Sequence, residues 1–286
     1  LNGTLVRTSG GQTYNGTVTT GGALTLRTTG GGSISAPGAV TTTAGTLTLD
    51  TGSGDATFSA NGNNFGTVQV TSGGAVSLTD SNAMTLGTSS AGTLFARTLS
   101  GNLTQSGNLS ATGSGDSIVL VSAGNFLNPG SSTLSPGAGR FLVYSSDPSL
   151  DTRGGLAYAF KQYNAQYGST TVQGTGNGFL YTLAPTITAG LTGTVSKGYD
   201  GTTSATLAAG NYTVSGAVDG DAVTLNNSSS GTYDNRNAGT GKTVTASGVS
   251  IASATNGAAT VYGYQLASSS PSGAVGQITA RAITVS

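Results

Sequence analysis

Residues 1–128 form a succession of short runs in which apolar and polar residues alternate. Six runs are clear, at residues 23–27, 45–49, 66–70, 75–79, 83–86 and 117–121. Alternation with period two is typical of β-strands, and Gly, Asn, Asp or Ser follows the runs as turn residues would. Because no helical period competes with this pattern, it predicts strands and turns only.

The strand runs come closely enough together to indicate a repeat. Residues 52–55 and 113–116 both read GSGD, which is typical of a degenerate repeat. In a parallel β-helix, inward positions need small or medium apolar residues, and corners need Gly or Asn. We therefore predict that residues 1–138 form a shaft, a right-handed parallel β-helix. An antiparallel sandwich is the alternative, because it produces the same alternation.

Aromatic residues concentrate between positions 139 and 184, where the composition changes. Tyr144, Tyr158, Phe160 and Tyr163 lie in this segment. Side chains of this kind can close the open end of a β-helix, which otherwise exposes unpaired backbone groups. We predict a capping and junction segment with packed aromatic side chains, since aromatic residues more often serve cores than sites. A ligand groove built from them is the alternative.

Residues 185–286 return to short alternating runs, at residues 186–189, 222–225, 242–246, 248–251 and 282–285. Strands at this spacing over about a hundred residues are typical of a compact β-sandwich. We predict that this region is a separate small domain with an Ig-like sandwich fold. The predicted class of the whole chain is therefore all-β.

Composition restricts the function more than the strand pattern does. The chain has 48 Gly and only 7% charged residues, it lacks Cys, His and Trp, and all ten acidic residues are Asp. The lack of Cys excludes disulfides and thiolate metal sites, as in bacterial exoproteins that cross membranes unfolded. The ten basic residues are scattered singly and form no stripe for nucleic acid. No stretch approaches the roughly 20 apolar residues of a membrane-spanning helix.

We do not expect an enzyme. Glycoside hydrolysis needs two carboxyl groups that face one cleft, and only Asp219 and Asp221 lie close in sequence. Residues 218–221 resemble a hairpin turn, in which Asp is favoured for local hydrogen bonding. Without His or Cys, a general base or nucleophile would need unusual substitutes. We predict no catalytic residue, no cofactor site and no metal site.

Three blocks in the C-terminal region resemble a known module. They are residues 197–203 (KGYDGTT), 231–242 (GTYDNRNAGTGK) and 262–266 (YGYQL). Their types and order are similar to those of the YDG module of large bacterial surface proteins. The Gly-rich shaft and residues 139–148 resemble the C-terminal part of filamentous-haemagglutinin-type adhesins. This resemblance implies a fragment of a secreted cell-surface exoprotein that leaves the cell by two-partner secretion, through an outer-membrane partner.

Tyr199, Asp200 and Gly201 have the residue types of a tight turn. Asp can accept hydrogen bonds from nearby backbone N–H groups, Gly supplies positive φ, and Tyr can pack over the turn. The same logic applies to Tyr233 and Asp234. A sugar or calcium site at the two Asp residues is the alternative. The structural interpretation is favoured, because Asp is common in turns.

We expect a structural and adhesive role, as a rigid spacer or filament segment outside the cell. The alternative is a carbohydrate- or receptor-binding module that uses Tyr144, Tyr158, Phe160 and Tyr163. The family resemblance also implies that Asn residues in Asn-X-Ser/Thr sequons can be glycosylated, and the chain contains such sequons. They occur at Asn2, Asn15, Asn102, Asn108, Asn211 and Asn227.

Open strand edges predict the partners of this chain. Both ends of a β-helix and the outer strands of a sandwich present unpaired N–H and C=O groups. Neighbouring modules of the same protein, or further copies of it, would cover them. We expect residues 282–285 to form a strand that pairs with a following unit. Deletion of residues 282–286 should then lower the mass measured by light scattering, and a monomer before and after deletion would contradict this.

Overall fold

The protein folds as two units, which divide after Leu183. The computed structural model describes residues 3–283. We call residues 1–183 the solenoid unit and residues 184–286 the C-terminal unit. The described residues contain no α-helix, and a single 3₁₀ turn, η1, covers Ala209–Asn211. The predicted all-β class, a parallel β-helix followed by a separate small β domain, is confirmed.

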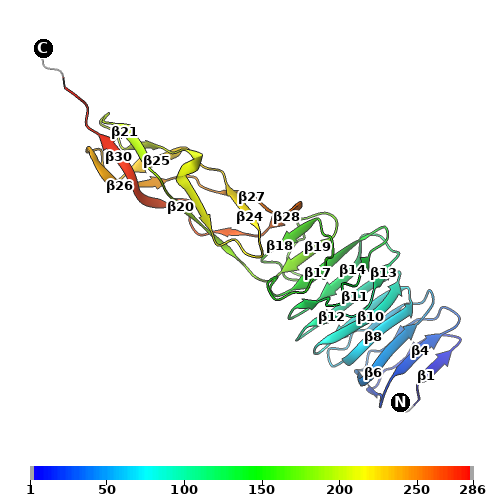
Figure 1. Ribbon diagram of the computed structural model, residues 1–286. Helices are drawn as coiled ribbons and strands as arrows, with labels where there is room; N and C mark the ends of the chain where they lie inside the picture. The colour runs from blue at the N-terminus through cyan, green and yellow to red at the C-terminus, as the bar shows by residue number, and fades with distance from the viewer. Residues whose placement is uncertain (1–2, 284–286) are drawn as a thin grey trace. The chain divides into compact units, whose positions relative to one another are not determined.

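Two parallel sheets form the walls of the solenoid unit, with strands stacked along the chain (Figure 1). Sheet A contains, in spatial order, β1 (Leu5–Thr8), β4 (Leu24–Thr28), β6 (Val40–Asp50), β8 (Asn64–Ser72), β10 (Met84–Ala91), β12 (Leu103–Gln105) and β15 (Phe126–Leu127). Sheet B contains β2 (Gln12–Thr13), β5 (Ile34–Ser35), β7 (Ala56–Phe58), β9 (Ala75–Asp80), β11 (Thr93–Thr98), β14 (Asp116–Val121), β17 (Arg140–Ser145), β19 (Gly178–Tyr181) and β18 (Phe160–Gln162). Short strands β3 (Val18–Thr19), β13 (Leu109–Ala111) and β16 (Leu134–Ser135) extend the ladders of sheet A.

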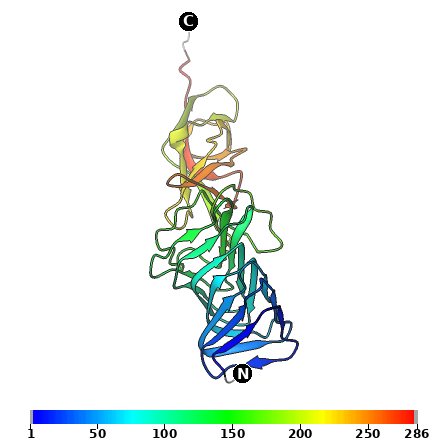
Figure 2. The same cartoon turned by 90° about the vertical axis from the view of Figure 1, so that its right-hand side faces the viewer.

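The chain alternates between the two sheets, and successive coils stack on one another, as the turns in Figure 2 show. The length of the coil varies. Val68 pairs with Leu86 of the following coil, whereas Leu94 pairs with Ile118, which is a longer step along the chain. The pairing is parallel throughout, so like positions of successive coils lie directly above one another. This is the arrangement that the degenerate repeat predicts, and it gives about eight turns.

Columns of stacked apolar side chains fill the space between the two sheets. Period-two alternation directs every second residue inward, and the register places these inward residues in line from coil to coil. Each fully buried Leu, Val or Phe contributes about 2 kcal/mol to folding. One column of sheet A consists of Leu24, Leu47, Val68 and Leu86. One column of sheet B consists of Ile34, Ala56, Val76, Leu94, Ile118 and Phe141. All of these residues are at most 2% exposed.

Glycines line one corner of the solenoid, where neighbouring coils come closest. The backbone N–H of Gly74 donates to Gly54 O at 2.7 Å, and that of Gly92 donates to Gly74 O at 2.8 Å. A Cβ atom on Gly54 would lie 2.5 Å from Gly32 O and 2.7 Å from Gly31 O. No side chain fits at that distance from backbone atoms. The corner therefore needs glycine for close approach of the coils.

Polar side chains bridge coils at other corners. The amide of Asn63, which is fully buried, donates to Thr79 O at 2.9 Å and accepts from the backbone N–H of Val40 at 2.8 Å. Asp80 is also fully buried, and it accepts from the backbone N–H of Phe65 at 2.7 Å. A buried backbone polar group without a partner would cost about 1–3 kcal/mol. These side chains therefore satisfy corner groups that strand pairing leaves unpaired.

The last coil of the solenoid unit breaks the regular pattern. Val143 of β17 pairs with Phe179 of β19, so this coil is longer than those before it. The intervening segment forms β18, which pairs with the far edge of β19, so the order in the sheet is β17-β19-β18. Residues 146–159 connect β17 to β18, and residues 163–177 form a loop that returns the chain to β19.

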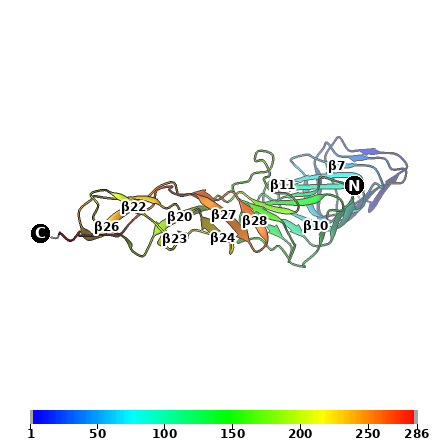
Figure 3. The same cartoon turned by 90° about the horizontal axis from the view of Figure 1, so that it is seen from above.

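The C-terminal unit consists of short strands in three small groups (Figure 3). One group is β23 (Tyr212–Ser215), β20 (Thr186–Leu191) and β29 (Gln265–Leu266). A second is β21 (Val195–Gly198), β30 (Ser272–Thr279), β26 (Gly239–Ala246), β25 (Ser230–Tyr233) and β22 (Ser204–Thr206), and the third is β24 (Ala222–Leu225), β27 (Ile251–Asn256) and β28 (Ala259–Tyr262). Their own core includes Ile187, Val195, Leu207, Tyr233, Val244 and Ile278.

Two of the predicted strands in this unit differ from the structure. Residues 248–250 form a turn before β27, because Gly248 takes a positive φ of 70°, which a regular strand does not accommodate. Ala282 and Ile283 lie beyond β30 and are not in a strand. The rest of the predicted 282–285 strand, and of the 282–286 deletion, falls outside the described residues.

The corner glycines generate a stability prediction. We expect Gly54→Ala to lower the free energy of unfolding by about 1–3 kcal/mol, because its Cβ would overlap the backbone of the previous coil. Gly22→Ala is the matched control, since a Cβ there meets no atom within 4 Å and its effect should stay within about 0.5 kcal/mol. Urea unfolding measures both variants. Equal midpoints for Gly54→Ala and the wild type would contradict close coil contact at this corner.

Candidate functional site

The aromatic segment does not form a single groove. Phe160 and Tyr163 are each 1% exposed and Tyr144 is 7% exposed, whereas Tyr158 is half-buried, with its ring 5.3 Å from that of Phe179. Two of the four residues proposed from sequence are therefore core residues. Tyr144 lines a pocket.

Three aromatic rings form a cluster on the outer face of sheet B. Phe95 on β11 and Tyr144 on β17 alternate with inward residues, so they point outward. Tyr167, from the loop after β18, lies 5.4 Å from the ring of Phe95 and 5.3 Å from that of Tyr144, between ring centroids. We call these three residues the outer aromatic cluster. It holds the loop against the outside of the solenoid.

A tight turn gives this loop a defined shape. The backbone N–H of Ala165 donates to Tyr181 O at 2.9 Å, which ties the loop to the end of β19. Thr170 closes the turn, since its N–H donates to Gln166 O at 3.0 Å and its hydroxyl accepts from the N–H of Gln166. Tyr167, at the tip, remains 38% exposed. The loop thus presents one aromatic ring in a fixed position.

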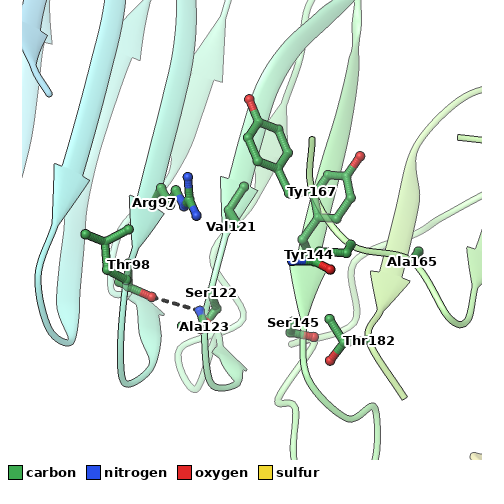
Figure 4. A pocket seen from close by; sticks show the side chains of 12 residues that line it. Arg97, Thr98, Val121, Ser122, Ala123, Tyr144, Ser145, Ala165, Tyr167 and Thr182 are labelled. Carbon is green, nitrogen blue, oxygen red and sulfur yellow. Dashed lines mark hydrogen bonds between the residues drawn. The ribbon is translucent and has the colours of Figure 1, made fainter. Parts of the chain in front are cut away.

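A pocket of about 180 Å³ lies next to the outer aromatic cluster (Figure 4). It is formed where the neighbouring strands β11, β14, β17 and β19 end, and the loop closes one side. All of its lining residues belong to the solenoid unit. They are Arg97, Thr98, Leu99, Val121, Ser122, Ala123, Tyr144, Ser145, Ala165, Gln166, Tyr167 and Thr182.

The hydroxyl groups in the pocket are part of the coil-to-coil network. Thr98 Oγ1 accepts from the backbone N–H of Ala123 at 3.0 Å, the bond drawn in Figure 4, and donates to a backbone carbonyl. Ser145 Oγ donates to a carboxylate oxygen of Asp151 at 2.7 Å. Arg97 is different, because its side chain is exposed and forms no hydrogen bond or ion pair within residues 3–283. It is the single charged residue of the lining.

Asp151 lies behind Ser145, outside the pocket lining. Its second carboxylate oxygen accepts from the backbone N–H of Phe126 at 2.8 Å. Burial raises the pKa of Asp151 to about 6, although both hydrogen bonds act in the opposite direction. Desolvation therefore outweighs hydrogen bonding at this carboxyl group.

The tyrosine–aspartate blocks of the C-terminal unit form two turns, and in each a lysine pairs with the aspartate: Lys197 with Asp200, and Lys242 with Asp234. Lys197 Nζ lies 2.9 Å from a carboxylate oxygen of Asp200 and donates to Thr202 O, also at 2.9 Å. The same ammonium lies 5.5 Å from the ring centre of Tyr233, a buried residue whose hydroxyl donates to Val195 O at 2.8 Å. Each block therefore stabilises the fold through hydrogen bonds, and the two are joined by one cation–π contact.

Residues 182–271 match the model of the YDG domain. Residues 2–72 and 73–134 match, as two copies, a family described as repeats of unknown function, and each copy contains one GSGD sequence. Neither a curated protein nor a solved structure matches the chain. Together with the solenoid, these matches support a repeat-rich β-helical protein that carries a YDG domain.

In the YDG domain, both Asp residues have turn roles, as the sequence predicts. Asp200 accepts from the backbone N–H of Thr202 at 2.9 Å, and its hydrogen bond with Lys197 lowers its pKa to about 2. The hydrogen bond from Lys242 likewise lowers the pKa of Asp234. Tyr199 differs from the prediction. It is 40% exposed, and Tyr233 supplies the ring next to Lys197.

The candidate carboxylates for catalysis do not gather around the pocket. Asp219 is at a turn with a φ of 52°, and the backbone N–H of Asp221 closes that turn on Val218 O at 3.0 Å. Among the described residues, no group of three His, Cys, Asp or Glu side chains could hold a metal ion. The described part of the chain also has no helix with the length and hydropathy of a membrane span.

Sequence reasoning did not find Arg97, Gln166 or Thr182 as pocket residues. Arg97 lies about two coils before Tyr144 in the chain, and only parallel stacking brings their strands together. Phe95 and Arg97 lie on the same face of β11, but this strand is not among those predicted from the sequence. Without the register, the sequence does not show which later residues lie beside Arg97.

The raised pKa of Asp151 generates a pH prediction. The folded state binds this proton more tightly than the unfolded chain does, since the unfolded pKa is about 3.9. The resulting stability is present below about pH 4 and is lost as pH rises through about 6. Asp151→Asn cannot ionise, so it should raise the free energy of unfolding at pH 7.5 by about 1–3 kcal/mol and flatten its decline between pH 4 and 7.

Urea unfolding at several pH values measures this effect. Asp147→Asn is the control, because it removes the same charge from the turn that precedes Asp151 and should leave the decline in place. A decline of the same size in Asp151→Asn and the wild type would show that Asp151 is not its source.

Proposed function

We propose that this chain is a structural and adhesive segment of a large secreted bacterial surface or filament protein of the filamentous-haemagglutinin type. The observation that carries this proposal is the succession of a parallel solenoid and a YDG domain in one chain. A solenoid gains length by adding coils, and each coil supplies a new stretch of outer surface for display. This architecture suits a shaft better than a soluble metabolic enzyme.

Export by the two-partner route, without enzymatic activity, is part of the same proposal. A chain with no Cys needs no oxidation step to fold outside the cell. Neutral and sparsely charged surfaces support contact with neighbouring modules or further copies, because they lack charge repulsion. The proposed partners are therefore adjacent modules, other copies of the chain and an outer-membrane secretion protein.

A second candidate function is a carbohydrate- or receptor-binding module. The pocket beside the outer aromatic cluster favours it. Because Tyr163 is a core residue, loss of binding on Tyr163→Ala would report lost folding as well as a lost contact. Tyr167, which is exposed, and Arg97 are better positions for such a test.

Surface labelling tests the proposed location. Antibodies raised against residues 186–279 should label intact bacteria that produce the protein, and labelling should fall to background when the outer-membrane partner is deleted. An antibody against a cytosolic protein controls for leaky cells. Labelling that requires permeabilised cells would contradict the proposal. Beads coated with the purified chain should also attach to host cells or to bacteria more than beads coated with a neutral protein of equal size.

A further inference from the structure

We propose that the pocket beside Arg97 binds a terminal sugar that carries a carboxylate, as in an acidic glycan. The inference rests on the proposed adhesive function for its setting, and it names the class of ligand. Its physical basis is separate, because the pocket is built within the solenoid unit, by residues between positions 97 and 182.

The charge of the pocket selects an anion. Arg97 is exposed at its edge, forms no ion pair or hydrogen bond in the part of the chain that the structure describes, and has no carboxylate beside it in the lining. The planar guanidinium presents parallel N–H donors that match the two oxygens of a carboxylate. The other arginines of this unit's later coils are engaged: Arg140, for example, pairs with Asp116. Arg97 therefore remains available for a ligand.

The outer aromatic cluster supplies a surface for the ring of a sugar. Tyr167 is 38% exposed, and contacts with Phe95 and Tyr144 fix its orientation before any ligand binds. A pyranose ring has an apolar face of C–H groups that can pack on an aromatic ring. Since Tyr167 is already ordered, little side-chain entropy is lost on binding.

Polar groups around the pocket can bind sugar hydroxyls. Gln166 is exposed, and its side-chain amide forms no hydrogen bond among residues 3–283. The hydroxyls of Ser145 and Thr182 already donate, to Asp151 and to Ser146 O. Each keeps lone pairs that can accept from a ligand. A ligand with several hydroxyl groups satisfies such acceptors, whereas an apolar acid does not.

The size of the pocket limits the ligand to one ring. Its volume of about 180 Å³ lies below the roughly 300–1,000 Å³ of sites that enclose drug-sized molecules. A single acidic monosaccharide at the end of a glycan matches this volume, with the rest of the glycan outside. We therefore expect weak binding of one free sugar, and tighter binding only when several copies of the chain are displayed together.

NMR titration of the ¹⁵N-labelled chain tests the proposal with sodium glucuronate and glucose. Glucuronate should shift the amide signals of the pocket saturably in the millimolar range, and glucose should bind about tenfold or more weakly. Arg97→Gln should abolish this preference, and Tyr167→Ala should weaken both sugars about tenfold. Arg7→Gln is the matched control, because it removes the same charge from an exposed position on β1 and should leave binding unchanged.

Several results would overturn the proposal. These are no saturable shift with glucuronate, equal affinity for glucuronate and glucose, or equal losses in Arg97→Gln and Arg7→Gln. Sodium acetate and an acetylated dipeptide serve as further probes, and binding of either as tightly as glucuronate would show an anion or peptide site instead of a sugar site. Thermal unfolding verifies that each variant is folded. Surface labelling of cells is independent of these titrations, so failure here and failure of the proposed location can be distinguished.

Discussion

Hydrogen bonding between successive coils is the constraint on which this structure depends. Parallel strands must lie about 4.8 Å apart, and the corners that connect them must approach as closely as the strands do. At the corner that contains Gly54, Gly74 and Gly92, the N–H of one glycine donates to the carbonyl of the glycine one coil earlier. A Cβ atom has no space between these backbones. The 48 glycines of the chain are thus explained in part by packing, and not by flexibility.

Polar corner residues complete the same ladder, mostly with uncharged side chains. Asn63 forms hydrogen bonds with backbone groups of the coils before and after its own. The carboxyl group of Asp80 accepts a hydrogen bond from the backbone N–H of Phe65. Burial raises the pKa of Asp80, as it does for Asp151. Most such positions carry Asn, Ser or Thr, which satisfy N–H and C=O groups at no cost of charge desolvation. Uncharged side chains at the corners agree with the low content of charged residues in the chain.

The candidate site arises where the repeat is interrupted. The coil between β17 and β19 is longer, and its loop folds back over sheet B to place Tyr167 on Phe95 and Tyr144. This arrangement creates a concave surface beside Arg97 that the strands alone do not provide. In a solenoid, a loop of this kind adds a binding surface on the outside of the coils, and its tip residue Tyr167 packs on outward-facing rings.

The sequence by itself determined the all-β class, the succession of a β-helix and a separate small domain, and several of the longer strands, since period-two alternation and turn residues are local signals. It also identified the Asp200 and Asp234 turns, in which short-range hydrogen bonds decide the conformation. Tertiary structure decided the rest. Residues 248–250 form a turn although they alternate like a strand, and the burial of Phe160 and Tyr163 agrees with the predicted aromatic packing at the expense of the alternative groove. The pocket could not be predicted, because Arg97, Tyr144 and Tyr167 are brought together by coil register and by the path of one long loop. Register depends on the length of every coil, and this length changes along the solenoid even before the long coil, so no local pattern records which side chains become neighbours.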